Sequence, residues 1–213
     1  MLELNTPHGL ARSHLLPVES PVAGLVLGHG AGGGLESPDL VGAAEAARSV
    51  GLSVALVEQP YRVAGRRSPA PARQLDVAWT SVVLQLREGP LGGLPVLTGG
   101  RSSGARVACR TAAETDSVAV LCLAFPLHPP GHPEKSRLPE LDAVRVPTLV
   151  VQGESDPFGT PPAAANRTVN RIPGTHSLKS SAAVGAAVSH WLTTVATGRM
   201  RDSAPRPGEP HEH

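Results

Sequence analysis

The residues best suited to chemistry surround a serine. Residues 99–104 read GGRSSG and contain the pattern Gly-x-Ser-x-Gly, after a predicted strand at 95–98 and before a predicted helix at 103–113. In that context the serine stands on a sharp turn that lifts its hydroxyl out of the sheet. The pattern predicts Ser102 as a nucleophile and the backbone N–H of Ser103 as a donor to an oxyanion. A glycine-rich turn with incidental serines is the alternative.

An acid and a histidine follow two later strands. Asp156 lies in a turn after a predicted strand at 147–151, and His176 lies in a loop after a weaker strand at 168–172. A histidine can take the proton of a serine hydroxyl, and an acid can hold the imidazole in the tautomer that this requires. We therefore expect Ser102, Asp156 and His176 to act together, with Asp156 as the acid and His176 as the general base.

Other residues compete for these two roles. Glu154 is the second acid in the same turn, and Asp156 could instead only close an Asx-turn. His190 falls on the flank of the apolar face of the predicted last helix, which favours a surface or core position. The choice of acid depends on which carboxylate turns toward His176.

A run of glycines follows the first predicted buried strand, at 23–28. Residues 29–34 read HGAGGG. A backbone that aims N–H groups at an oxyanion needs glycines, so the run predicts the Ala31 N–H as the second oxyanion donor. His29 is expected to be structural and to take no part in proton transfer.

The same glycines also fit a dinucleotide pattern. Gly28, Gly30 and Gly33 match the pattern Gly-x-Gly-x-x-Gly. Glu58 follows these glycines at about the sequence spacing of the acid that binds ribose in such sites. However, the next helix begins only near Pro38, which is too late for a pyrophosphate to sit on its N-terminus. The run also lacks the lysine of a phosphate-binding loop. The oxyanion interpretation therefore fits better.

Strands and helices alternate along the chain, which predicts βαβ units and a mostly parallel sheet with helices on both faces. Ligands of such sheets bind at the carboxyl ends of the strands, where the residues above lie. Residues 1–20 are expected to be irregular with room for two short strands, and 62–71 and 126–143 to be loops. Buried strands are predicted at 23–28, 52–57, 95–98, 118–125, 147–151 and 168–172, and helices at 37–49, 72–88, 103–113 and 181–197.

Length and composition suit one α/β domain. Of the 213 residues only 2% are aromatic, so the core must be built from Val, Leu and Ala. We expect a single domain over 1–198 and a disordered polar tail over 199–213. The 19 Lys and Arg residues balance 18 Asp and Glu residues, so no charge excess favours nucleic acid or an anionic membrane as a partner.

Cysteine content and apolar runs narrow the class further. Cys109 and Cys122 are too few for a disulfide framework or a Cys-based zinc site, and both are expected in the core. The N-terminus has no basic segment before an apolar one, and no apolar run approaches the roughly 18 residues of a membrane span. These features predict a soluble cytoplasmic protein.

Five segments carry a resemblance to a known family. The chain resembles a small α/β-hydrolase of the dienelactone hydrolase-like group, and within it a compact bacterial branch of predicted hydrolases with eukaryotic relatives. The resemblance covers most of residues 23–197. The segments are GHGAGGG at 28–34, GGRSSGARVA at 99–108, FPLHPPG at 125–131, VQGESDPFG at 151–159 and GTHSL at 174–178.

The resemblance implies an α/β-hydrolase fold with little or no cap domain. It also implies Ser102 as nucleophile, Asp156 as acid and His176 as base. Dienelactone hydrolases use a cysteine as nucleophile, so the serine here argues against that substrate. Ala105 stands where many relatives carry a second glycine, and its small side chain should still allow close packing.

The expected function is therefore hydrolysis of a small carboxyl ester or thioester through an acyl-enzyme, with no cofactor or metal required. An acyltransferase or haloperoxidase would use the same residues. A non-catalytic interaction module on the same fold is the alternative from another class, because a fold alone does not determine function. An intact set of Ser, Asp and His favours the enzyme.

Arg101 and His128 are two further residues with expected roles near the nucleophile. Arg101 precedes the nucleophile at a position where a buried charge needs a partner, so it is expected either to pair with an acid or to meet an anionic substrate. His128 is expected to bind substrate at the mouth of the pocket, on a short proline-rich lid. His128 and His132 lie four residues apart, which would suit two ligands of one metal ion, but no third ligand is near in the sequence.

Overall fold

The central feature of the fold is one eight-stranded sheet. The computed structural model describes residues 1–202, with side chains described up to residue 195. The strand order is β1-β2-β4-β3-β5-β6-β7-β8. The bounds are β1 Leu2–Thr6, β2 Gly9–Leu16, β3 Ala23–Gly28, β4 Leu52–Glu58, β5 Val96–Arg101, β6 Val120–Leu123, β7 Thr148–Gly153 and β8 Arg167–Ile172.

Strands β4, β3, β5, β6, β7 and β8 are parallel to one another, whereas β1 and β2 add an antiparallel edge, with β2 antiparallel to β4. The prediction of a mostly parallel sheet is confirmed. The buried strands are apolar on both faces, which is typical of parallel sheets covered on both sides. Since the parallel strands share one direction, the segments that follow them gather at one edge.

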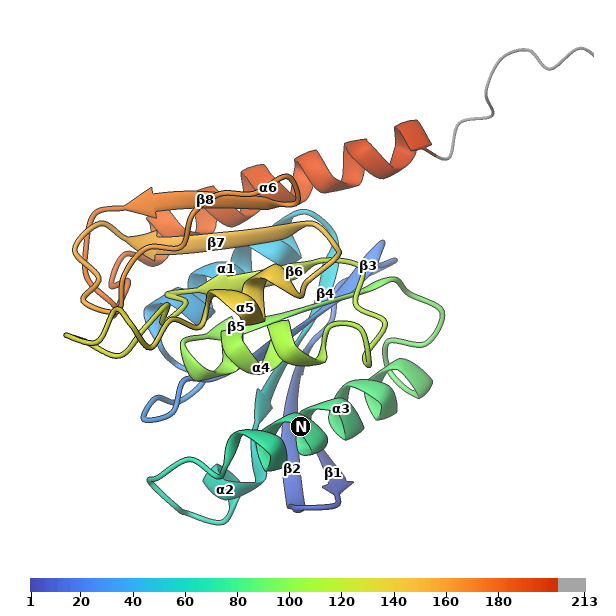
Figure 1. Cartoon of the computed structure of the whole chain (residues 1–213). Coiled ribbons are helices and arrows are strands. Elements are labelled where there is room, and N and C mark those ends of the chain that lie inside the picture. Colours follow the sequence, from blue (N-terminus) through green and yellow to red (C-terminus); the bar gives the residue numbers. More distant parts are fainter. Residues whose placement is uncertain (203–213) are drawn as a thin grey trace, which may run out of the picture.

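Helices cover both faces of the sheet (Figure 1). The bounds are α1 Pro38–Ser49, α2 Pro60–Val63, α3 Ala72–Glu88, α4 Ser103–Thr111, α5 Leu138–Asp142 and α6 Ser181–Asp202. α1 and α6 pack against each other on one face, and α3 and α4 lie on the other (Figure 1). Between β6 and β7 the structure has only the short helix α5, so there is no cap domain in this connection.

Alternate residues of the strands supply three separate cores, one against α1 and α6, a second against α3 and a third against α4 and α5. On β3, Leu25 and Leu27 pack with α1 and α6, whereas Val26 faces α3. Trp79 of α3 is 1% exposed, and it fills the second core. Most of the other buried side chains are Val, Leu and Ala, as the low aromatic content requires.

Three predictions of local structure were wrong. The last helix does not end at Gly198 but continues to Asp202, so the predicted tail at 199–213 begins too early; residues 203–213 lie outside the described part. α2 and α5 fall in segments predicted as loops. Both helices begin with proline at the first turn, where its missing N–H costs nothing.

The cysteines occupy the predicted places in the core. Cys109 on α4 and Cys122 on β6 are buried and free, with their Sγ atoms 3.4 Å apart. The hydrogen bond to Cys122 and burial raise the pKa of the Cys109 thiol well above its usual range. Within residues 1–202, no helix combines the length and apolar character that a membrane span needs.

Candidate active site

Ser102 stands on a strained turn between β5 and α4. Its φ of 51° and ψ of −108° fall in a backbone region that residues other than glycine rarely adopt. A Cβ on Gly100 or on Gly104 would lie 2.5 Å from the carbonyl oxygen of Gly28, so neither position accepts a larger residue without moving β3. The two glycines thus allow the turn to approach the neighbouring strand closely.

His176 lies between Ser102 and Asp156. Its Nε2 is 2.9 Å from Ser102 Oγ, and its Nδ1 is 2.9 Å from Asp156 Oδ2. Because a carboxylate only accepts hydrogen bonds, Nδ1 carries the imidazole proton and Nε2 is free to accept the Ser102 hydroxyl proton. The structure therefore brings the three predicted residues together in a continuous chain of hydrogen bonds.

The Asp156 carboxylate is fully buried and receives three donors. Oδ2 accepts from the Gln152 amide at 2.7 Å as well as from His176, and Oδ1 accepts from the Phe158 backbone N–H at 2.9 Å. The competing acid Glu154 is exposed, and within the described part of the chain its carboxylate makes no hydrogen bond or ion pair with His176, whose Nδ1 bonds to Asp156. The Phe158 ring lies against the His176 imidazole with centroids 4.2 Å apart. These contacts fix both the acid and the ring that it orients.

The segment 29–33, which we call the oxyanion loop, is fixed by two hydrogen bonds of the His29 ring. The Gln59 backbone N–H donates to His29 Nε2 at 3.1 Å, so the ring proton is on Nδ1, which donates to the Gly30 carbonyl at 2.8 Å. Burial lowers the pKa of His29 and keeps it neutral. Both ring nitrogens are thus engaged away from Ser102, in agreement with a structural histidine.

Two backbone N–H groups are available near the nucleophile. Among the described residues, neither the Ala31 N–H nor the Ser103 N–H donates to an acceptor. The Gly30 carbonyl, which shares a peptide with the Ala31 N–H, accepts from His29 Nδ1, and the Tyr61 hydroxyl donates to the Ala31 carbonyl of the next peptide at 3.0 Å. Burial raises the pKa of Tyr61. Both N–H groups therefore remain free to donate to a bound molecule.

Arg101 joins the loops of the site through a buried ion pair. Its Nε lies 2.8 Å from Oδ2 of Asp39, whose side chain is fully buried, and its Nη2 donates to the His176 carbonyl at 3.3 Å. A Cβ on Gly30 would lie 2.7 Å from Arg101 Nη1, so the guanidinium packs directly against the oxyanion loop. Of the two expected roles for Arg101, pairing with an acid is the one that the structure shows.

We expect Asp39→Asn to lower the free energy of unfolding by about 3–5 kcal/mol, since it leaves the Arg101 charge buried without a counter-charge. Urea denaturation measures this difference. The matched control is Glu3→Gln, which removes the acid of the exposed pair with Arg12 and should cost less than about 1 kcal/mol. Equal losses of unfolding free energy in the two variants would mean that the buried Asp39–Arg101 pair stabilises the fold no more than the exposed Glu3–Arg12 pair does.

The remaining predicted residues lie farther from the hydrogen-bonded chain. The His128 ring packs against Gly159, where an added Cβ would lie 2.5 Å from His128 Nε2. The His128 backbone N–H donates to the Phe158 carbonyl. His132 is exposed and bonded to Glu134. No group of three His, Cys, Asp or Glu side chains in the described part of the chain is arranged to hold a metal ion.

Three residues that support the site were not identified from the sequence. Asp39 lies at the start of the predicted helix at 37–49, where nothing in the sequence indicates that its side chain is buried. Gln152 directly follows the apolar residues 149–151, which is a signal for a buried polar role, whereas Tyr61 follows two polar residues and a proline and carries no such signal. Their partners lie in other segments, and the sequence does not display such contacts.

Comparison with known proteins agrees with the fold. A family model described as an alpha/beta hydrolase domain matches residues 21–200. An α/β serine hydrolase without lid from Xanthomonas campestris shares the fold with a TM-score of 0.68 and 20% identity, over 89% of this chain and 93% of that one. A search of curated protein sequences found no match.

Two further solved structures have similar folds. Est1E from Butyrivibrio proteoclasticus with bound ferulic acid has a TM-score of 0.73 at 15% identity, over 92% of this chain and 100% of that one. A dienelactone hydrolase from Anabaena variabilis has a TM-score of 0.72 at 19% identity, over 91% and 95%. With a family model over most of its length and the α/β-hydrolase topology of its sheet, the chain belongs to the alpha/beta hydrolase domain family.

Proposed function

We propose that the protein is a serine hydrolase that acts on carboxyl esters or thioesters. The observation that carries the proposal is the hydrogen-bonded chain from Ser102 through His176 to Asp156. Ser102 is the nucleophile, His176 the general base and Asp156 the acid that orients it. The Ala31 and Ser103 N–H groups form the oxyanion hole.

In the first half of the reaction Ser102 Oγ attacks the carbonyl carbon while His176 Nε2 takes the hydroxyl proton. The carbonyl oxygen becomes negatively charged and is bound by the two N–H groups, each worth on the order of 10²–10³ in rate. As the tetrahedral intermediate collapses, the bond to the leaving oxygen or sulfur breaks. His176 returns the proton to that leaving group, and an acyl-Ser102 ester remains.

In the second half a water molecule takes the place of the leaving group. His176 Nε2 removes one of its protons as the water oxygen attacks the acyl carbon, and the same proton returns to Ser102 Oγ when the acid departs. Asp156 stabilises the imidazolium in both halves. Every proton transfer thus passes through one histidine nitrogen, which the structure positions 2.9 Å from Ser102 Oγ.

The neighbouring structures and the open edge of the sheet support small substrates. The Butyrivibrio structure is described as holding ferulic acid, a small aromatic acid, and the Xanthomonas structure as lacking a lid. The short connection between β6 and β7 agrees with an uncovered site. We extend the proposal to His128 as a residue that contacts substrate, to a single catalytic domain that includes α6 up to Asp202, and to a cytoplasmic location.

A fluorophosphonate probe tests the proposal, because it reacts only with an activated serine nucleophile. We expect one adduct per chain, located on Ser102 by peptide mapping. Ser103→Ala, which changes the neighbouring serine, should label at the wild-type rate, and His176→Ala should label at least about 100-fold more slowly. A folded wild-type protein that does not react would favour the non-catalytic interaction module instead.

A further inference from the structure

Two cavities adjoin each other at the carboxyl end of β4. One, of about 220 Å³, lies between the β1–β2 turn, α2 and the start of α3, and the other, of about 500 Å³, lies along residues 66–71. Both are lined by Tyr61, Arg66, Ala70 and Gln74, so they adjoin along these four residues, and we call the two together the basic cavity. Its dimensions are those of a site for a small organic molecule.

The charges around the basic cavity are all of one sign. Arg66 and Arg67 line it, and no Asp or Glu does. Neither guanidinium forms an ion pair or a side-chain hydrogen bond with any residue in the described part of the chain. Arg106 and Arg110 on α4 show the contrast, since both pair with Glu140. The unpaired charges favour a negatively charged occupant.

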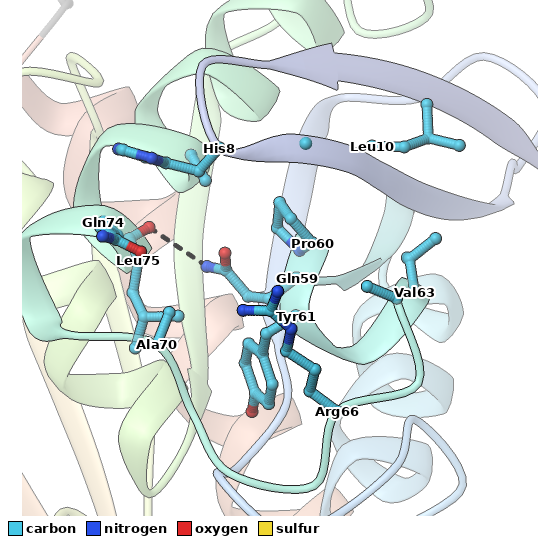
Figure 2. Close-up of a pocket in the computed structure, with 13 residues that line it drawn as sticks. His8, Leu10, Gln59, Pro60, Tyr61, Val63, Arg66, Ala70, Gln74 and Leu75 are labelled. Carbon is cyan, nitrogen blue, oxygen red and sulfur yellow. Dashed lines mark hydrogen bonds between the residues drawn. The ribbon is translucent and has the colours of Figure 1, made fainter.

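The shape of the cavity suits an anion carried on an organic group. Figure 2 shows the Arg66 side chain extending from its loop toward Gln59 and Tyr61. Leu75 and Ala78 are buried and give the cavity an apolar floor, whereas Gln74 at its rim is exposed and polar. An apolar floor with a few polar and charged groups at the rim is the usual composition of a small-molecule site.

The basic cavity contacts the oxyanion loop through Tyr61. Tyr61, which lines both parts of it, donates its hydroxyl to the Ala31 carbonyl at 3.0 Å. Ala31 follows Gly30, where a Cβ would lie 3.6 Å from the Cβ of Ser102. The width of the oxyanion loop and one tyrosine side chain therefore separate the reacting serine from the cavity.

We propose that the basic cavity binds the anionic end of the substrate, a carboxylate or phosphate, while the reacting carbonyl lies at Ser102. This inference rests on the proposed function and adds the substrate class: esters or thioesters that carry a negative charge away from the scissile bond. Arg66 and Arg67 bind the anion as charged hydrogen-bond donors, so their contribution appears in KM and in kcat/KM and weakens as salt is added.

Matched pairs of esters test the proposal. One pair places the charge on the alcohol side (4-acetoxybenzoate against its neutral methyl ester), and the other places it on the acyl side (mono-4-nitrophenyl adipate against 4-nitrophenyl hexanoate). We expect kcat/KM to favour the anionic member of at least one pair by about tenfold at low salt. A wild-type enzyme that hydrolyses the neutral esters as well as the anionic ones in both pairs would overturn the inference.

Two double variants carry the same change in charge. Arg66→Ala/Arg67→Ala is expected to bring the preference for the anionic ester over the neutral one to about one. Arg48→Ala/Arg73→Ala removes two exposed arginines that do not line the cavity and should keep the preference. An unchanged preference in the first variant, or an equal loss in both, would overturn the assignment of Arg66 and Arg67.

A titration with inorganic phosphate separates this inference from the proposed function. If no ester is hydrolysed, the proposed function fails, yet amide NMR shifts near Arg66 and Gln74 that are absent in Arg66→Ala/Arg67→Ala would still support an anion site. No shifts would overturn the anion site as well. Phosphate binding without any preference among hydrolysed esters would mean that a separate anion occupies the cavity, which contradicts the substrate assignment.

Discussion

Ser102→Ala lowers kcat/KM for an activated ester by on the order of 10⁵-fold or more. The variant retains the Asp156–His176 pair and both oxyanion donors, so it loses only the atom that forms the acyl-enzyme. Catalysis above the background is then limited to what the oxyanion hole and substrate binding provide without a covalent intermediate. Steady-state hydrolysis of 4-nitrophenyl acetate, with the enzyme concentration raised to detect slow turnover, measures the loss.

The strain at position 102 supplies a control against simple misfolding. Alanine at a φ of 51° bears the same strain as serine, so the free energy of unfolding of Ser102→Ala should stay within about 1 kcal/mol of wild type. Ser102→Gly accepts this backbone without strain and should be at least as stable as the wild type, although equally inactive. Activity that survives in the folded alanine variant would place the nucleophile elsewhere.

Much of the site could be predicted because its residues directly follow strands. In a parallel sheet the carboxyl ends of the strands share one edge, so the segments after β3, β5, β7 and β8 must converge. Local patterns then indicate what each segment offers: glycines around Ser102, a turn at Asp156 and a loop at His176. The order of these residues along the chain adds to the specificity of the prediction.

The supporting contacts could not be predicted in the same way. Asp39 and Arg101 lie 62 residues apart and meet only when α1 packs beneath the oxyanion loop. The Tyr61 hydroxyl meets the Ala31 carbonyl 30 residues away, because the short helix α2 returns toward that loop. Each contact depends on the angle between packed elements, which periodicity and turn patterns leave open.

Helix ends were the least predictable local feature. Gly198 predicted a stop, but α6 passes through it to Asp202. A glycine ends a helix when the chain turns into the left-handed region there, and within an otherwise helical segment it costs only about 1 kcal/mol relative to alanine. The residues up to Val195 that pack against α1 and the sheet were predicted correctly, since their spacing reflects burial.

Asp156→Asn is expected to lower kcat by about 10⁴-fold while the protein stays folded. Three donors point at the Asp156 carboxylate, from Gln152, Phe158 and His176. An asparagine has one oxygen and one NH₂ group, so it cannot accept all three. If its NH₂ group faces His176 Nδ1, the imidazole proton moves to Nε2, and that nitrogen can no longer accept the proton of Ser102.

The opposite orientation of the amide is also unfavourable. With the oxygen toward His176, the NH₂ group faces the Phe158 N–H, and two donors confront each other in a buried site. Kinetics on the same ester, together with urea denaturation, separate the loss of rate from the loss of stability. The matched control is Glu154→Gln, two residues earlier and exposed, which should leave kcat unchanged. A fall in kcat of similar size in both variants would contradict the assignment, because it would show that the turn as a whole, and not the buried carboxylate, sustains the histidine.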